Sequence, residues 1–150
     1  MSIKLESQLV GVAGEYLVAG ELSLRGHIAS ITLRNSRGID IIASNSDGSK
    51  SITIQVKTNS SGGKNWILTK KSETFFSENH FYVFVSLGSI GQRPKFHIVP
   101  SKVVANSISA GHASWLSGTK KNGGKRKDSN IRKFSDNSEQ YLETWDLIKL

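Results

Sequence analysis

The sequence contains no cysteine and only two prolines in 150 residues. Without cysteine the chain has no disulfide, thiolate zinc site, iron–sulfur cluster or cysteine nucleophile, and a reducing compartment suits it. No apolar run approaches the ~20 residues that span a bilayer, and no apolar signal segment follows Met1. We therefore expect a soluble, cytoplasmic protein with no membrane partner, and the length predicts a single domain over residues 1–150.

Acidic residues are scarce as well. Twelve Asp and Glu stand against 20 Lys and Arg, which gives a formal net charge of +8 and favours a polyanionic partner. Seven cations lie in a glycine-containing stretch, residues 118–133, which we interpret as a basic loop. Together with Arg34 and Arg37 they are the candidate nucleic-acid contacts: Lys120, Lys121, Lys125, Arg126, Lys127, Arg132 and Lys133. The alternative is a solvated loop that only keeps the protein soluble.

Hydrophobic periodicity predicts helices at both ends of the chain and strands between them. Apolar residues at helical spacing predict a helix over residues 4–25, with one face formed by Leu5, Leu9, Val12, Ala13, Tyr16, Leu17 and Leu24. Period-two alternation predicts strands at 27–33, 39–44 and 51–58, which tight turns join into an antiparallel meander.

The second half of the chain continues this mixture. We expect further strands at 81–87 and 95–99, a helix at 100–111 and a last helix at about 137–148. The whole pattern predicts an α/β (α+β) fold, in which helices flank a mixed central sheet of about five strands, in the order αβββ(α)ββαα.

One group of residues can carry chemistry. Asp40 lies in an apolar strand between Ile39 and Ile41, where an acid is costly unless it is paired or binds a metal. Gln55 and Lys57 share one face of the next strand. The turn between the two strands places Asp40 nearly opposite Gln55, with their Cβ atoms about 4.5–5.5 Å apart.

Such a pair can share one cation, with the carbonyl of Val56 as a further oxygen ligand. Ligands that are all oxygen suit Mg²⁺. Lys57 would then lie beside the attacking water, and Glu15 on the first helix would hold another water of the ion. The same residues also fit a wet strand face on which Asp40 and Lys57 form a weak cross-strand ion pair.

Three short motifs resemble the active-site signature of the PD-(D/E)xK nuclease superfamily: Gly14-Glu15, Arg37-Gly38-Ile39-Asp40 and Ile54-Gln55-Val56-Lys57. The predicted order of elements over residues 8–90 is also that of the superfamily's core, a restriction-endonuclease-like fold. Two positions depart from the signature: Gly38-Ile39 replaces its proline, and Gln55 replaces its second acid.

The resemblance implies a role for each matching residue. Asp40 binds the metal, Gln55 occupies the second acidic position and Lys57 is the family lysine. Glu15 matches the helix glutamate of resolvase-like and homing-endonuclease-like members. The implied catalytic set is Glu15, Asp40, Gln55 and Lys57, with Mg²⁺ as cofactor.

The function implied by the resemblance is a Mg²⁺-dependent endonuclease that hydrolyses phosphodiester bonds in DNA, most simply double-stranded DNA, in a homing, resolvase or defence role. Because one site per subunit cuts one strand, we also expect a dimer or higher homo-oligomer. Two alternatives stay open. One is a catalytically inactive nucleic-acid-binding module with the same fold, which Gln55 favours. The other is a basic interaction protein with an acidic partner, which leaves Glu15, Asp40 and Lys57 unexplained.

Overall fold

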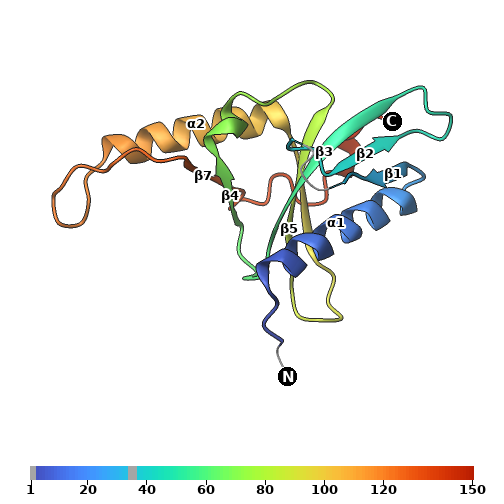
Figure 1. The fold of residues 1–150 in the computed structure, drawn as a ribbon, viewed down its shortest axis with the longest axis horizontal. Coiled ribbons are helices and arrows are strands. Elements are labelled where there is room, and N and C mark those ends of the chain that lie inside the picture. Colours follow the sequence, from blue (N-terminus) through green and yellow to red (C-terminus); the bar gives the residue numbers. More distant parts are fainter. Residues whose placement is uncertain (1–2, 34–36) are drawn as a thin grey trace.

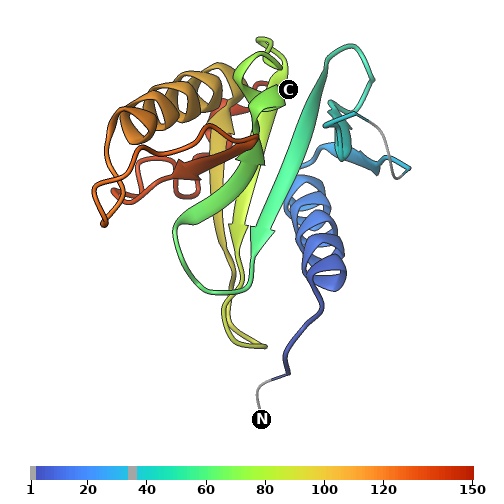
Figure 2. The same ribbon diagram turned by 60° about the vertical axis from the view of Figure 1, so that its left-hand side comes forward.

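The computed structural model describes residues 3–33 and 37–150 and arranges them in three layers, with a sheet between two covering layers (Figure 1; Figure 2). The elements in chain order are α1 (Ser7–Leu24), β1 (Ile28–Ile31), β2 (Ile41–Ser44), β3 (Ser51–Asn59), β4 (Asn65–Thr69), the 3₁₀ turn η1 (Lys70–Glu73), β5 (His80–Ser86), β6 (Lys95–Pro100), α2 (Ser101–Ser117), β7 (Ile131–Ser135) and the 3₁₀ turn η2 (Trp145–Leu147).

The main sheet has five strands in the order β1-β2-β3-β5-β6. β1, β2 and β3 form the predicted antiparallel meander, in which Ile41 pairs with Ile54. β3 then runs parallel to β5, and β5 runs antiparallel to β6. Every residue of β5 is buried, as its nearly continuous apolar sequence predicts. The expected mixed sheet of five strands and the α+β fold class are confirmed.

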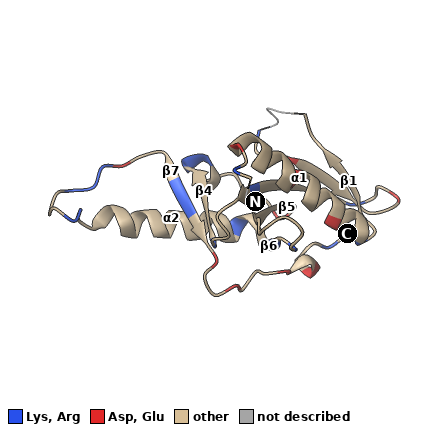
Figure 3. Ribbon diagram, turned by 90° about the horizontal axis from the view of Figure 1, so that it is seen from below, with Lys and Arg blue, Asp and Glu red and all other residues tan. Residues whose placement is uncertain are grey.

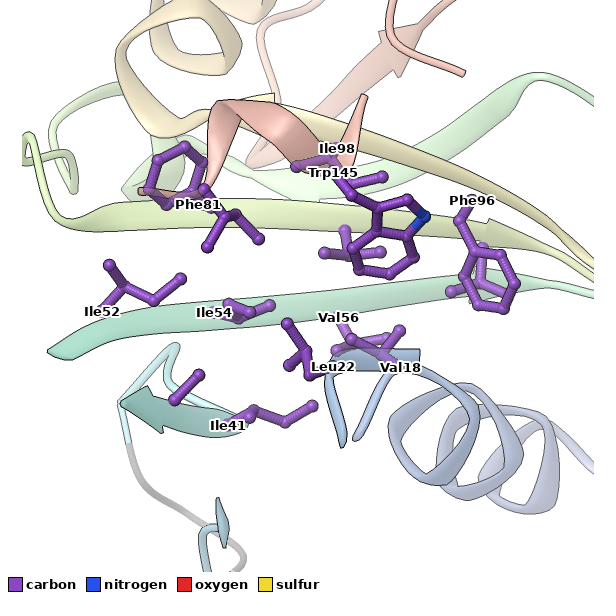
Figure 4. Close-up of a cluster of buried hydrophobic side chains, with 14 residues drawn as sticks. Val18, Leu22, Ile41, Ile52, Ile54, Val56, Phe81, Phe96, Ile98 and Trp145 are labelled. Carbon is purple, nitrogen blue, oxygen red and sulfur yellow. The ribbon is translucent and has the colours of Figure 1, made fainter. Parts of the chain in front are cut away.

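One face of this sheet packs against α1 and the C-terminal segment. The alternation predicted for β3 is present, because Ile52, Ile54 and Val56 are all buried in the same cluster (Figure 4). Val18 and Leu22 of α1 contact this cluster. Further along it, Phe96 of β6, Trp145 of η2 and Ile148 complete the core on this side.

α1 lies within the predicted range, residues 4–25, but it begins later, at Ser7, and does not have the predicted inner face. Its buried residues are Val10, Gly14, Val18 and Leu22, whereas Leu9, Tyr16 and Leu24 of the predicted stripe are exposed. The reason is a close approach at Gly14. A Cβ atom on Gly14 would lie 1.8 Å from Oγ1 of Thr58 in β3, so only glycine lets the helix backbone come this near the strand. This contact turns the glycine side of the helix inward and the larger side chains outward.

The other face of the sheet packs against a two-stranded ribbon, β4 and β7, and against α2 (Figure 2). Trp66 and Leu68 of β4 and Phe134 of β7 cover Tyr82 and Phe84 of β5. The sequence did not predict β4, which lies where a helix or a turn was expected. Five residues paired with a segment more than sixty residues away leave no local signal beyond the alternation of Trp66 and Leu68.

α2 extends to Ser117 and does not end near Gly111 as predicted. Glycine in a helix costs roughly 1 kcal/mol relative to alanine, and the packing of Val104 and Ile108 against β5 and the ribbon is sufficient to carry the helix past it. Arg126 supports the far end, because its Nη1 donates to the carbonyl of Trp115 over 2.6 Å.

The basic loop is shorter than predicted. Residues 119–125 form a small hairpin with a bridge between Thr119 and Lys125, and the chain then enters β7, which contains Arg132 and Lys133. Arg132 is buried and donates from Nε to the carboxylate of Glu73. The prediction that Arg132 is an exposed nucleic-acid contact was therefore wrong. Its guanidinium group pairs with Glu73 and joins β7 to η1.

The predicted last helix at 137–148 is also wrong. That segment consists of turns followed by η2, and Glu139 and Glu143 have positive φ angles of 57° and 56°. It runs along β6 instead, where the amide of Ile98 donates to Tyr141 and that of Glu143 to Phe96. Hydrogen bonds to a strand replace those that a helix would have made within itself.

Among the residues that the structure describes, no helix is both long and apolar enough to cross a membrane.

The contact of Gly14 with Thr58 gives a first prediction. Gly14→Ala should lower the free energy of unfolding by about 1–3 kcal/mol, because the added methyl group overpacks the interface between α1 and β3. Gly20→Ala is the matched control in the same helix, since a Cβ there meets nothing within 4 Å. It should raise stability by about 0.5–1 kcal/mol. Urea unfolding measures both; equal effects of the two variants would contradict the close packing.

Candidate active site

Asp40 is fixed at the point where β2 leaves β3. Its amide donates to the carbonyl of Ile54 over 2.8 Å, and its Oδ2 accepts the amide of Val56 over 2.7 Å. The amide of Asp40 thus makes the last backbone hydrogen bond from this strand to β3. Its side chain then accepts the next β3 amide, that of Val56. The hydrogen bond from the Val56 amide therefore holds the carboxylate against β3.

Gln55 and Lys57 follow Ile54 and Val56, the two residues of β3 whose backbone groups bond to Asp40. The register of β2 and β3 ends where Ile41 pairs with Ile54, and the amide of Asp40 bonds to the carbonyl of the same Ile54. Oε1 of Gln55 lies 3.6 Å from the position that a Cβ on Gly38 would take, so the amide reaches the turn that carries Asp40. Lys57 follows two residues later on the same face.

Two opposing effects act on the Asp40 carboxyl group. Burial raises its pKa above the usual value, and this is the largest effect. The hydrogen bond from Val56 and the positive charge of Lys57 lower it. The positive charge of Lys57 thus favours the ionised form of Asp40.

The predicted role of Val56 depends on the direction of its carbonyl group. In an extended strand the N–H and C=O of one residue point toward the same neighbour. Since the amide of Val56 points to Asp40, its carbonyl oxygen faces the same edge of β3. The sheet therefore offers a carboxylate, an amide oxygen and a backbone carbonyl at one place.

Glu15 comes to this region through α1. The helix packs on β3 at Gly14 and Thr58, one residue beyond Lys57, and Glu15 is the next residue, partly buried. β2 pairs only with Ser51–Ile54, so beyond Val56 it is the helix that approaches this edge of β3. The close approach at Gly14 brings the backbone of α1 against Thr58, and the role of Glu15 at this site stays a prediction.

The ligand set fits Mg²⁺ by its chemistry. Mg²⁺ binds through one or two carboxylates, keeps several waters and prefers oxygen, and Asp40 with Gln55 and the Val56 carbonyl supplies oxygen alone. Within residues 3–33 and 37–150 no group of three or more His, Cys, Asp or Glu gathers at one point. The site is consequently less negative than one with a second carboxylate at position 55.

Two residues that the sequence analysis did not select help to shape the site. Oγ1 of Thr32 donates to the carbonyl of Ile39 over 2.6 Å and so holds the turn before Asp40. Phe75 lies against Gly38, with Cε1 3.4 Å from the position of a Cβ there. Gly38 has a φ of 70°, so it is favoured both by its conformation and by this contact. No short motif marks either residue: Thr32 lies seven residues before Ile39, and Phe75 belongs to a distant segment.

The predicted nucleic-acid contacts divide between two places. Arg37 is exposed in the turn before Asp40, whereas Arg34 lies outside the described residues. Figure 3 shows the remaining cations along the hairpin beyond α2 and on β7. Exposed on this side are Lys120, Lys121, Lys125, Lys127 and Lys133, and Arg126 is half-buried against Trp115. The hairpin lies at the end of the molecule away from β1 and β2 (Figure 1).

Comparison with known proteins supports the fold. No family model matches the sequence, and no curated protein matches it. Among solved structures, the chain is similar to a Holliday junction resolvase from Archaeoglobus fulgidus, with a TM-score of 0.51 and 14% identity over 87% of this chain and 86% of the resolvase. It is also similar to a bacterial homing endonuclease, with a TM-score of 0.56 and 14% identity over 96% of this chain and 91% of the endonuclease. The resemblance to the PD-(D/E)xK nuclease fold is thereby confirmed at the level of the fold.

His80 gives a prediction about the layer behind the site. It is buried beside Phe75, its Nδ1 lies 2.7 Å from Oγ1 of Thr53, and burial lowers its pKa to about 4. Between pH 6.5 and about 4 the unfolded chain therefore binds a proton that the folded protein does not. The free energy of unfolding should therefore decrease as the pH is lowered from 6.5 to about 4, by up to about 1.4 kcal/mol per pH unit. Denaturant titrations of wild type and His80→Phe test this: the variant should show a smaller slope, and equal slopes would contradict the assignment.

Proposed function

We propose that this protein is a metal-dependent endonuclease that hydrolyses phosphodiester bonds in DNA, with Asp40, Gln55, Lys57 and Glu15 as its active-site residues. The observation that carries the proposal is the placement of Asp40. Its carboxylate accepts the amide of Val56, the residue between Gln55 and Lys57 in β3, and it lies on a fold shared with a resolvase and a homing endonuclease.

The residues divide the work between them. Asp40, Gln55 and the carbonyl of Val56 would hold Mg²⁺, which when bound polarises the scissile phosphate. Lys57 stabilises the negative charge that develops on the phosphate during in-line attack and orients the attacking water. Glu15 accepts a hydrogen bond from water on the side of α1. No residue of the protein forms a covalent bond with the substrate.

Gln55 sets the strength of the metal site. Its amide oxygen can ligate a cation but adds no charge, so Asp40 supplies the sheet's only formal negative charge within this ligand set. Binding of Mg²⁺ is then weaker than with two carboxylates. This is the feature that favours the second candidate function, a DNA-binding protein of the same fold without cleavage, and one experiment separates the two.

The cations place the DNA on two surfaces. Arg37 lies next to Asp40, and the exposed lysines of the hairpin extend the positive surface along the molecule (Figure 3). Contacts of this kind fix the position of a duplex through its phosphates and do not read its sequence. We also propose that the protein acts as a dimer, since cutting both strands needs two sites.

Asp40→Asn should abolish Mg²⁺-dependent cleavage of supercoiled plasmid. Asparagine retains an oxygen that accepts the Val56 amide, so the fold should persist while the charge that holds the metal is lost. Asp47→Asn is the matched control, since Asp47 lies in the turn at the other end of the same strand pair. Thermal unfolding with and without Mg²⁺ adds a binding readout: Mg²⁺ should raise the Tm of wild type and of Asp47→Asn, but not that of Asp40→Asn.

Full cleavage by Asp40→Asn would overturn the assignment of the site. Gln55→Glu distinguishes the two candidate functions, because it restores a second carboxylate. If wild type cleaves, the variant should reach half-maximal activity at a lower Mg²⁺ concentration. If wild type binds DNA without cleaving it and Gln55→Glu cleaves, the protein is the inactive form of the fold.

Removing the hairpin charges should reduce the salt dependence of duplex binding. Each phosphate neutralised contributes about −0.9 to the slope of log affinity against log salt. Replacing Lys120, Lys121 and Lys125 with serine should therefore make the slope less steep by about two to three. The control replaces three exposed lysines elsewhere with serine, at positions 4, 50 and 149. Similar slopes for the two triple variants would show that the hairpin does not contact phosphates.

A further inference from the structure

A groove lies between α2 and the outer surface of the ribbon, far along the molecule from Asp40. Its volume is about 550 Å³. Ile67 of β4 and Ile131 of β7 line it, and both are more than half exposed. Gly111 forms part of the α2 wall, and Trp115 lies at the end nearer the hairpin. The core packing leaves these apolar surfaces uncovered.

The Trp115 ring is the most unusual part of this groove. It is 44% exposed, while the other two tryptophans, Trp66 and Trp145, are buried. Its neighbours are polar: His112 stacks with it at 5.7 Å between ring centroids, and the guanidinium of Arg126 lies 5.1 Å from its centre. An exposed aromatic ring next to a guanidinium group is a combination that accepts a further flat ring.

The charge around the groove is positive. Lys133 lines it, and the hairpin that carries Lys120, Lys121 and Lys125 begins directly after α2. The nearby acid, Asp128, is paired with His112 at 2.8 Å. A molecule that fits must therefore combine a flat apolar part for the groove with negative charges for its rim.

We propose that this groove binds an unpaired nucleobase of single-stranded nucleic acid, whose phosphates lie against the hairpin. A base within a duplex is stacked on both faces and offers only its edges, so it cannot enter the groove, whereas an unpaired base can. The inference rests on the proposed function in that it adds a second contact to DNA, and it makes substrates that combine duplex and single-stranded segments the preferred ones.

A second copy of the chain is the competing occupant, because Ile67, Ile131 and Trp115 together could cover another apolar surface. The charges oppose this. Two copies that met at this groove would bring two basic hairpins together in a protein whose formal net charge is already +8, whereas a polyanion neutralises them.

The test fills the groove without removing Trp115. A Cβ at Gly111 meets nothing within 4 Å, so Gly111→Leu should block the groove and leave the helix intact. Gly20→Leu in α1 is the matched control, because its Cβ also meets open space. The probe is a short oligothymidylate with a fluorescent label. Its affinity should fall on the order of tenfold in Gly111→Leu, the loss of one base-stacking contact, and stay unchanged in Gly20→Leu.

Tryptophan fluorescence gives an independent readout. Trp115 alone among the three tryptophans is exposed. The unlabelled oligonucleotide should therefore quench the tryptophan fluorescence of the wild type and of Gly20→Leu, but not that of Gly111→Leu. Equal affinity and quenching in the two glycine variants would overturn the proposal. Self-association of wild type that disappears in Gly111→Leu in sedimentation would also overturn it, in favour of a second copy.

The outcome is separable from that of the proposed function. Asp40→Asn should bind the oligonucleotide and be quenched as wild type is, and Gly111→Leu should cleave plasmid duplex at the rate of Gly20→Leu. If Asp40→Asn cleaves normally, the assignment of the active site fails while the groove result stands. If the oligonucleotide does not bind wild type that still cuts plasmid, the groove proposal alone fails.

Discussion

The hydrogen bond from the Val56 amide to the Asp40 carboxylate is the contact on which the candidate site depends. The Asp40 side chain accepts the hydrogen bond that a further residue of β2 would otherwise accept. The Val56 amide therefore keeps a partner where the pairing of β2 with β3 ends. The same departure leaves an edge of β3 beside which Gln55 and Lys57 project and α1 approaches. Burial of the carboxyl group raises its pKa, and the hydrogen bond from Val56 and then the charge of Lys57 act in the opposite direction.

The close approach of Gly14 to Thr58 has a second consequence. It draws the small side of α1 onto the sheet and leaves Leu9, Tyr16 and Leu24 in solvent. A helix oriented for burial alone would turn these side chains inward. The close packing of the α1 backbone on β3 at Gly14 is thus gained at the cost of apolar burial elsewhere on the helix.

The sequence was sufficient to predict the parts of the fold that depend on local patterns. The alternation of Ile52, Ile54 and Val56 predicted the inner face of β3, and the turn chemistry predicted the antiparallel pairing of β2 with β3. It could not predict β4, or the extended C-terminal segment, because their hydrogen bonds go to distant strands. Arg132 was misassigned for the same reason: its partner, Glu73, lies fifty-nine residues away. The sequence analysis did not select Phe75 and Thr32, because they contact the turn before Asp40 without belonging to a motif.

The ion pair between Arg132, which is buried, and Glu73, which is partly buried, joins β7 to η1. Glu73 belongs to η1, and two residues later Phe75 packs on Gly38 beside the site. Arg132 belongs to β7, whose outer side forms the groove, and it also donates to the carbonyl of Ser129 where the chain returns from the hairpin. An uncompensated buried charge is costly, so neither partner separates readily from the other. The ion pair therefore joins the ribbon strand that lines the groove to the segment that carries Phe75 beside Gly38.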